Sequence, residues 1–111
     1  MAADPLLTDP FSVRTAADAH DYVIAVYGEV DVLTTPDLVR EVERGLASPA
    51  AAVVVDLSAL RFIDSTGLHA MVVAWRRAQE LGKQLRLLQP PPAVHRAFEI
   101  TGLADALPFA D

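Results

Sequence analysis

Short, almost continuously apolar runs alternate along the chain with stretches in which apolar residues recur at helical spacing. The runs cover residues 22–27, 52–57 and 84–88, and residues 11–14 form a shorter candidate. The first two of these runs are rich in β-branched residues, which is typical of strands buried on both faces. We therefore predict a strand at each of the four places.

The intervening stretches predict three helices. Thr35 as N-cap, with Pro36 at the first helical position, marks the start of the first helix, and Ser48 and Pro49 end it. A second helix opens at residues 64–65 and stops at Gly82, and a third covers residues 93–101. The positions expected to face inward are Leu38, Val39, Val42 and Leu46, then Leu68, Met71, Val72, Trp75 and Ala78, then Val94, Ala97 and Phe98.

The order strand, strand, helix, strand, helix, strand, helix is typical of right-handed crossovers between parallel strands. We predict an α/β fold with a mostly parallel central sheet and helices packed on one side. One domain is expected over residues 11–111, preceded by a loose leader at residues 1–10. Residues 105–111 are expected to add a closing strand or a helical turn.

Composition narrows the choice of partner. Fifteen acidic residues against nine basic ones give a net charge of −6, which disfavours nucleic acid and anionic membranes. The absence of cysteine excludes disulfides and thiol catalysis. We find neither a signal-peptide pattern nor an apolar stretch near the roughly 20 residues that a membrane helix needs, and expect a cytoplasmic protein.

The spacing of catalytic residue types does not favour an enzyme. His20, His69 and His95 are too far apart in sequence for a metal-ligand motif. In a triad of Ser65, His69 and Asp64, the histidine would lie one turn along the same helix, and no independent carboxylate would orient it. We predict no catalytic activity.

Four carboxylates, those of Glu29, Asp31, Asp56 and Asp64, fall at or near strand ends. Converging carboxylates can bind Mg²⁺, but no phosphate-binding glycine loop accompanies them. Two interpretations of these carboxylates remain open: they recognise a partner, or they cap loops and helices. We predict no metal and no cofactor.

The segment at residues 62–68, Phe-Ile-Asp-Ser-Thr-Gly-Leu, joins a predicted strand to a predicted helix. Ser65 stands where the helix begins, and two roles are open to it. It can cap the helix, which contributes about 1 kcal/mol, or it can accept a phosphate that the helix dipole and free amides favour. Local physical chemistry alone favours the cap.

Four ordered blocks resemble the STAS domain family, specifically the bacterial anti-sigma factor antagonists. They are residues 28–31 with Thr34, residues 54–58, residues 62–68 and residues 94–103. In that family, the unphosphorylated antagonist binds an anti-sigma factor that is also a serine kinase, and so frees a sigma factor for transcription. Phosphorylation of the serine after the motif aspartate dissociates the complex, and a PP2C-type phosphatase reverses it.

The resemblance implies a phosphorylated partner-switching regulator without catalytic activity of its own. It assigns the phosphoacceptor role to Ser65, with Thr66 as the alternative. The partner-binding residues that it implies are Glu29, Asp31, Thr34, Asp64, Ser65, Thr66 and Gly67. A second hypothesis is a non-switching STAS subunit of a stress-signalling scaffold or a lipid-transport complex, in which Ser65 merely caps its helix.

Overall fold

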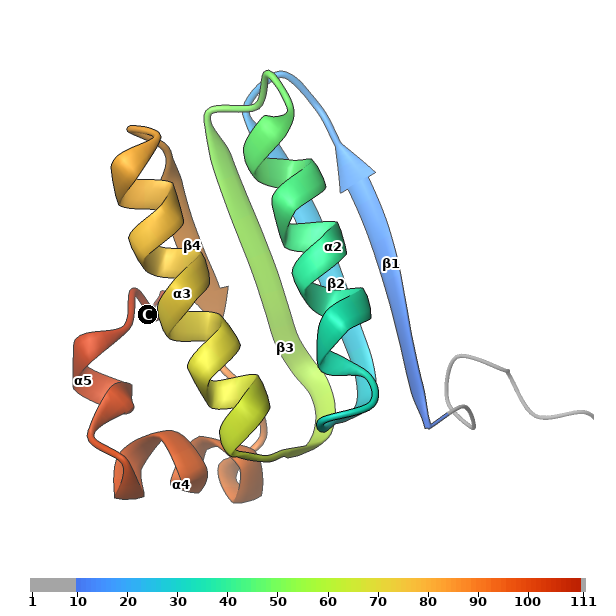
Figure 1. The fold of residues 1–111 in the computed structure, drawn as a ribbon, viewed down its shortest axis with the longest axis vertical. Helices are drawn as coiled ribbons and strands as arrows, with labels where there is room; N and C mark the ends of the chain where they lie inside the picture. Colours follow the sequence, from blue (N-terminus) through green and yellow to red (C-terminus); the bar gives the residue numbers. More distant parts are fainter. Residues whose placement is uncertain (1–9, 111) are drawn as a thin grey trace, which may run out of the picture.

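The computed structural model describes residues 10–110, so residues 1–9 of the predicted leader lie outside the described part. Figure 1 shows the arrangement of the elements. In chain order they are β1 (Phe11–Ala17), β2 (Asp21–Val30), α2 (Thr35–Ala47), β3 (Ala52–Ile63), α3 (Ser65–Glu80), β4 (Gln84–Leu88), α4 (Pro92–Ile100) and α5 (Leu103–Ala106).

The four strands form one sheet in the order β1-β2-β3-β4. β1 is antiparallel to β2, whereas β2, β3 and β4 are parallel to one another. Helices α2 and α3 lie side by side over one face of the sheet, and α4 and α5 follow at its lower left in the view (Figure 1). The predicted α/β architecture is confirmed, and the three apolar strands lie next to one another.

The core lies between the sheet and the helices. Most positions predicted to face inward are buried: Leu38, Val42, Leu46, Leu68, Met71, Ala78, Val94 and Phe98. Val72, Trp75 and Ala97 are half-buried and pack against the core rather than within it. Val39 departs most from the prediction, because its side chain is 38% exposed at the edge of α2 that faces α3.

Two contacts set how closely α2 approaches the sheet. Gly45 is buried, and a Cβ atom there would lie 2.8 Å from the ring of Tyr22. At the carboxyl end of the helix, the Lys83 ammonium donates hydrogen bonds to the carbonyls of Ser48 and Ala50. A cation is favourable at that end because of the helix dipole.

Several boundaries differ from the prediction for local reasons. β1 continues beyond residue 14 because the Asp18 carboxylate accepts hydrogen bonds from the His20 and Asp21 amides and closes a hairpin. β3 continues beyond residue 57, where it pairs with β2 but no longer with β4, and more of its residues are therefore exposed. Helix α2 has Thr34, not Thr35, as its N-cap residue.

The carboxyl-terminal segment contains both of the elements that were expected as alternatives. The short helix α5 is followed by an isolated parallel bridge between Leu87 and Phe109 on the edge of β4. The ring of Phe109 packs edge-on against Phe98, with 5.1 Å between ring centroids. This bridge covers the edge of β4, so β1 is the open edge of the sheet within residues 10–110.

The central strand provides a test of the architecture. Val55 is 0% exposed under the helices, and Val54, which points to the other face, is 5% exposed and has Arg86 beside it on β4. We expect Val55→Asp to unfold the domain, because an unpaired carboxylate in the core costs several kcal/mol. Val54→Asp should also be severely destabilising but cost somewhat less, because Arg86, which already pairs with Asp21 at 3.3 Å, lies beside the new carboxylate. Urea unfolding of both variants checks this, and equal losses would contradict the assignment of the two faces.

Candidate partner-binding site

The carboxyl ends of β2 and β3 meet the amino-terminal ends of α2 and α3 at one edge of the sheet (Figure 1). Val30 pairs with Ile63 at the ends of the two strands, and the Asp64 amide donates a 3.1 Å hydrogen bond to the Val30 carbonyl. The two loops that follow therefore lie together. All seven predicted partner-binding residues fall in these loops or directly beside them.

The N-cap residue of α3 is Asp64. Its carboxylate accepts hydrogen bonds from the Thr66 amide at 2.9 Å, from the Gly67 amide at 3.2 Å and from the Thr66 hydroxyl. The Thr66 hydroxyl is the main cause that holds the pKa of Asp64 below its ordinary value, followed by the Gly67, Thr66 and Val32 amides. The prediction that Ser65 caps the helix is wrong, because Asp64 has the extended backbone of the N-cap position and Ser65 is already the first helical residue.

Ser65 is the first residue of α3 and is exposed. Its hydroxyl makes no hydrogen bond to any residue of the described part of the chain. The Thr66 hydroxyl is also exposed, but it is held by Asp64. The two candidate acceptors thus differ, since only the Ser65 hydroxyl is free to rotate toward a partner.

Gly67 contributes to the site by its small size. It is buried, and a Cβ atom there would lie 2.7 Å from side-chain atoms of both Ile63 and Val30. Any larger residue would push the first turn of α3 away from the strand ends. The small size of Gly67 therefore sets the position of the first turn of α3, and of Ser65 with it.

The loop between β2 and α2 is a closed turn. The Asp31 carboxylate accepts hydrogen bonds from the Leu33 and Thr34 amides, at 2.9 and 3.1 Å. The Thr34 hydroxyl accepts from the Asp31 amide and donates to the Glu29 carbonyl, both at 2.9 Å. The turn leaves the side chains of Glu29, Val32 and Leu33 exposed.

The other polar residues considered from the sequence do not join this site. Asp56 is separated from it by seven residues of β3, and its carboxylate accepts a hydrogen bond from the nearby Ser58 amide. His95 pairs with Glu99 on α4, at 3.0 Å. Within residues 10–110, no group of three or more histidine and acidic residues is placed to hold a metal ion. No helix described there is long and apolar enough to cross a membrane.

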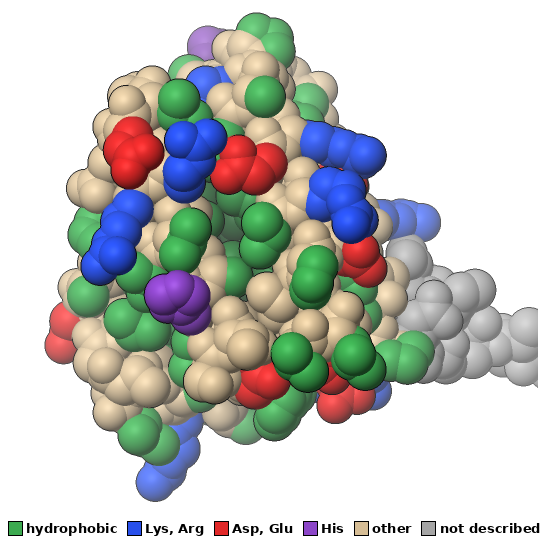
Figure 2. All heavy atoms as spheres, viewed as in Figure 1, with side chains coloured by type: hydrophobic (Ala, Val, Ile, Leu, Met, Phe, Trp, Pro, Cys, Tyr) green, Lys and Arg blue, Asp and Glu red, His purple; other side chains and the backbone are tan. Residues whose placement is uncertain are grey.

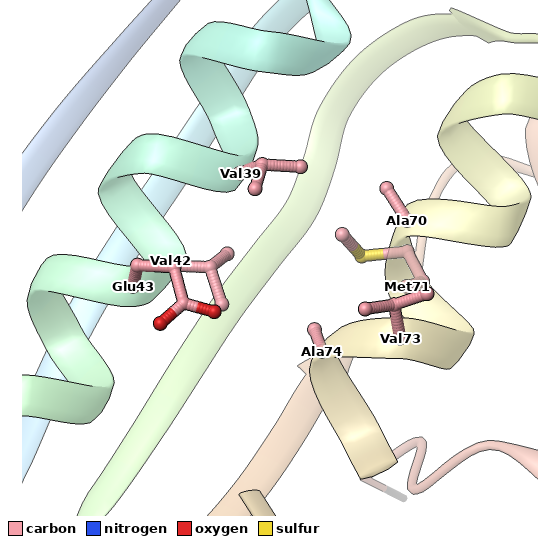
Figure 3. A pocket seen from close by; sticks show the side chains of 7 residues that line it. All are labelled: Val39, Val42, Glu43, Ala70, Met71, Val73 and Ala74. Carbon is pink, nitrogen blue, oxygen red and sulfur yellow. The ribbon is translucent and has the colours of Figure 1, made fainter. Parts of the chain in front are cut away.

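A shallow apolar groove separates α2 from α3, and the sequence pattern gave no sign of it. Its lining residues are Val39, Val42, Glu43, Ala70, Met71, Val73 and Ala74 (Figure 3). Figure 2 shows the hollow, with hydrophobic side chains on its walls and charged side chains gathered above it. An ion pair between Arg77 and Glu43, at 3.3 Å, joins the two helices along this face.

Comparison with known proteins gives the same family for nearly the whole chain. A family model described as "Mlab, STAS domain" matches residues 13–108. An anti-sigma-B factor antagonist of Staphylococcus aureus is 30% identical over 96 residues, which cover 86% of this chain and 89% of that protein. The chain therefore belongs to the STAS domain family, and its similarity is to the anti-sigma factor antagonists within it.

Solved structures agree with this assignment. The crystal structure of an anti-sigma factor antagonist from Mycobacterium paratuberculosis has a TM-score of 0.81 at 26% identity, covering 92% of this chain and 86% of that one. The Bacillus antagonist SpoIIAA, 20% identical, shares the fold in its phosphorylated form with a TM-score of 0.66, covering 91% of each chain. Its unphosphorylated form has a TM-score of 0.73, covering 91% of this chain and 88% of that one. The fold of that protein is thus present with and without phosphate.

The cap provides a test of the local geometry. We expect Asp64→Ala to destabilise the domain by about 1 kcal/mol, because two amides of α3 lose their acceptor. Asp64→Asn should lose less near neutral pH, because asparagine also caps helices.

The pKa of Asp64 is lowered by folding, so the carboxylate contributes its extra stability above the ordinary value of 3.8. That contribution is lost as the pH falls through the lower pKa of the folded state. Urea unfolding at pH 7 and at pH 2 to 3 checks this. The difference in free energy of unfolding between the native protein and Asp64→Asn should become smaller in acid. A gap independent of pH would contradict the ionised cap.

Proposed function

We propose that this chain is an anti-sigma factor antagonist switched by phosphorylation of Ser65. In the unphosphorylated state it binds an anti-sigma factor with serine kinase activity and releases a sigma factor for transcription. Phosphate on Ser65 ends that complex, and a PP2C-type phosphatase restores it. Such a role places the chain in the cytoplasm and requires no catalytic group or cofactor of its own.

The observation that carries the proposal is the free hydroxyl of Ser65 on the first turn of α3. A kinase requires a hydroxyl that can approach the γ-phosphate of ATP in line, without a competing hydrogen bond to break. Ser65 is exposed and makes no such bond within the described residues, whereas the Thr66 hydroxyl donates to Asp64. Membership of the STAS family supports the same residue, because Ser65 follows the motif aspartate.

The capped helix determines what a phosphate would meet. The Thr66 and Gly67 amides, which a phosphate at a helix start would otherwise use, already bond to Asp64. A phosphate on Ser65 carries about −1.5 to −2 charges and lies beside that carboxylate. The group would extend into solvent, where water and the helix dipole offset part of the repulsion.

At a protein interface, the same phosphate has no such compensation. A surface complementary to a neutral hydroxyl would have to accept a doubly charged group and remove its water. Unpaired charge of this kind at an interface typically costs 2–5 kcal/mol or more. The proposed switch therefore acts on binding rather than on folding.

The acceptor can be tested by incubating the chain with ATP and the kinase-type anti-sigma factor from the same genome, followed by intact-mass measurement. We expect one phosphate on the native chain and on Thr66→Val, and none on Ser65→Ala. Binding of unphosphorylated Ser65→Ala should be largely retained, because the interface accepts a small neutral side chain.

Two results would count against the acceptor assignment. Undiminished phosphate on Ser65→Ala, with loss on Thr66→Val, would transfer the role to Thr66. No phosphate on the native chain with any such kinase would favour the non-switching subunit.

A second test compares the two forms directly. We expect phosphorylation to weaken binding to the anti-sigma factor by at least about a hundredfold, which corresponds to roughly 2.7 kcal/mol. The melting temperature should change by only a few degrees, because the phosphate stays in solvent. Binding isotherms and thermal melts on both forms check this. Equal affinities would remove the switch, and a large fall in melting temperature would mean that phosphate acts by unfolding.

A further inference from the structure

Two apolar side chains stand in solvent beside the proposed phosphoacceptor. Leu33 is 82% exposed and Val32 is 64% exposed. They are consecutive residues on the turn between β2 and α2. Their exposure to water is unfavourable in free energy. Neither side chain packs in the core, so burial does not offset this cost.

The exposure is fixed by the backbone. The Asp31 carboxylate holds the Leu33 and Thr34 amides, and the Thr35 amide donates a 2.8 Å hydrogen bond to the Asp31 carbonyl. A turn closed in this way has little freedom to fold its apolar side chains back onto the domain. Rigid presentation also lowers the entropic cost of binding.

The turn lies within reach of any partner that covers Ser65. The Val30 carbonyl accepts from the amide of Asp64, next to Ser65, and Leu33 is three residues beyond Val30. Three residues span at most about 11 Å, and a closed turn spans less. A standard interface buries about 800 Å² on each partner, which corresponds to a disc of roughly 16 Å radius. A kinase bound over Ser65 therefore also covers the turn.

The surroundings of the turn indicate the chemistry of the surface that receives it. Glu29, Asp31 and Asp64 border it, and none of them forms an ion pair with another residue of the described part. Arg61, on the last part of β3, is the one base of that strand segment. A surface complementary to this turn would have an apolar pocket with basic residues at its rim.

We infer that Leu33, supported by Val32, is the apolar anchor by which this chain docks on the kinase-type anti-sigma factor. Leu33 fills an apolar pocket of that partner. The pocket has basic residues at its rim and lies close to the site where the partner's ATP meets Ser65. This inference rests on the proposed function and adds to it the residue that supplies affinity. Ser65 then carries the switch, and Leu33 carries much of the unswitched binding.

The test compares binding isotherms of the native chain, Leu33→Ser, Leu33→Met and Leu81→Ser with the ADP-bound anti-sigma factor. We expect Leu33→Ser to lose about ten- to a hundredfold in affinity, as removal of a buried leucine from an interface would predict. Leu33→Met should stay within a few-fold of the native chain, because it keeps the apolar volume. Leu81 is 47% exposed at the opposite end of α3, about 24 Å along the helix, so Leu81→Ser should bind like the native chain.

The outcomes separate this inference from the proposed function. If the native chain does not bind the anti-sigma factor, the proposed function fails, and the anchor fails with it. If the native chain binds and Leu33→Ser binds equally well, only the anchor is overturned. Sedimentation of the native chain provides a further arm: a dimer that Leu33→Ser converts to a monomer would make the turn a contact between two copies and overturn the inference. Thermal melts should show Leu33→Ser as stable as the native chain.

Discussion

The hydrogen bonds of the Asp64 carboxylate hold together the part of the molecule on which the site depends. Through its backbone amide, Asp64 is tied to the end of β2, and through its side chain it begins α3. The amide of Val32, on the neighbouring turn, also stabilises the ionised carboxylate and lowers its pKa. One residue thus joins the ends of β2 and β3 to the start of α3. The orientation of Ser65 follows from this arrangement, since it is the next residue along the chain.

The sheet brings this junction about. Three parallel strands place their carboxyl ends, and the amino-terminal ends of the helices that follow, at one edge. The close contact at Gly67 then brings the first turn of α3 against Val30 and Ile63. Burial of the valines of β3 therefore has a consequence far from the core, because it fixes the register that sets Asp64 beside Val30.

Periodicity in the sequence was sufficient to predict the strands, the main helices and a mostly parallel sheet, because burial on one or both faces leaves a regular pattern. Individual hydrogen bonds leave no such pattern. Asp64 and Ser65 can both cap the helix as far as the sequence tells, and only the backbone geometry decides that Asp64 reaches the amides. Val39 had the spacing of a core residue, but α3 stands far enough from α2 at this point to leave it at the wall of a groove. The exposure of Leu33 was missed for a related reason, because an apolar residue in a loop gives no periodic signal at all.

The division of roles between Asp64 and Ser65 has a physical basis. If Ser65 capped the helix, phosphorylation would remove the cap, and the modification would act on the stability of the domain. If the amides of Thr66 and Gly67 were free, they would bind the phosphate, and part of its charge would be hidden from a partner. Because the Thr66 and Gly67 amides donate to the Asp64 carboxylate, a phosphate on Ser65 would neither remove the cap nor be bound by these amides. The Ser65 hydroxyl makes no hydrogen bond within residues 10–110, so the proposed phosphorylation would leave the cap intact, and the added charge would stay exposed to a partner.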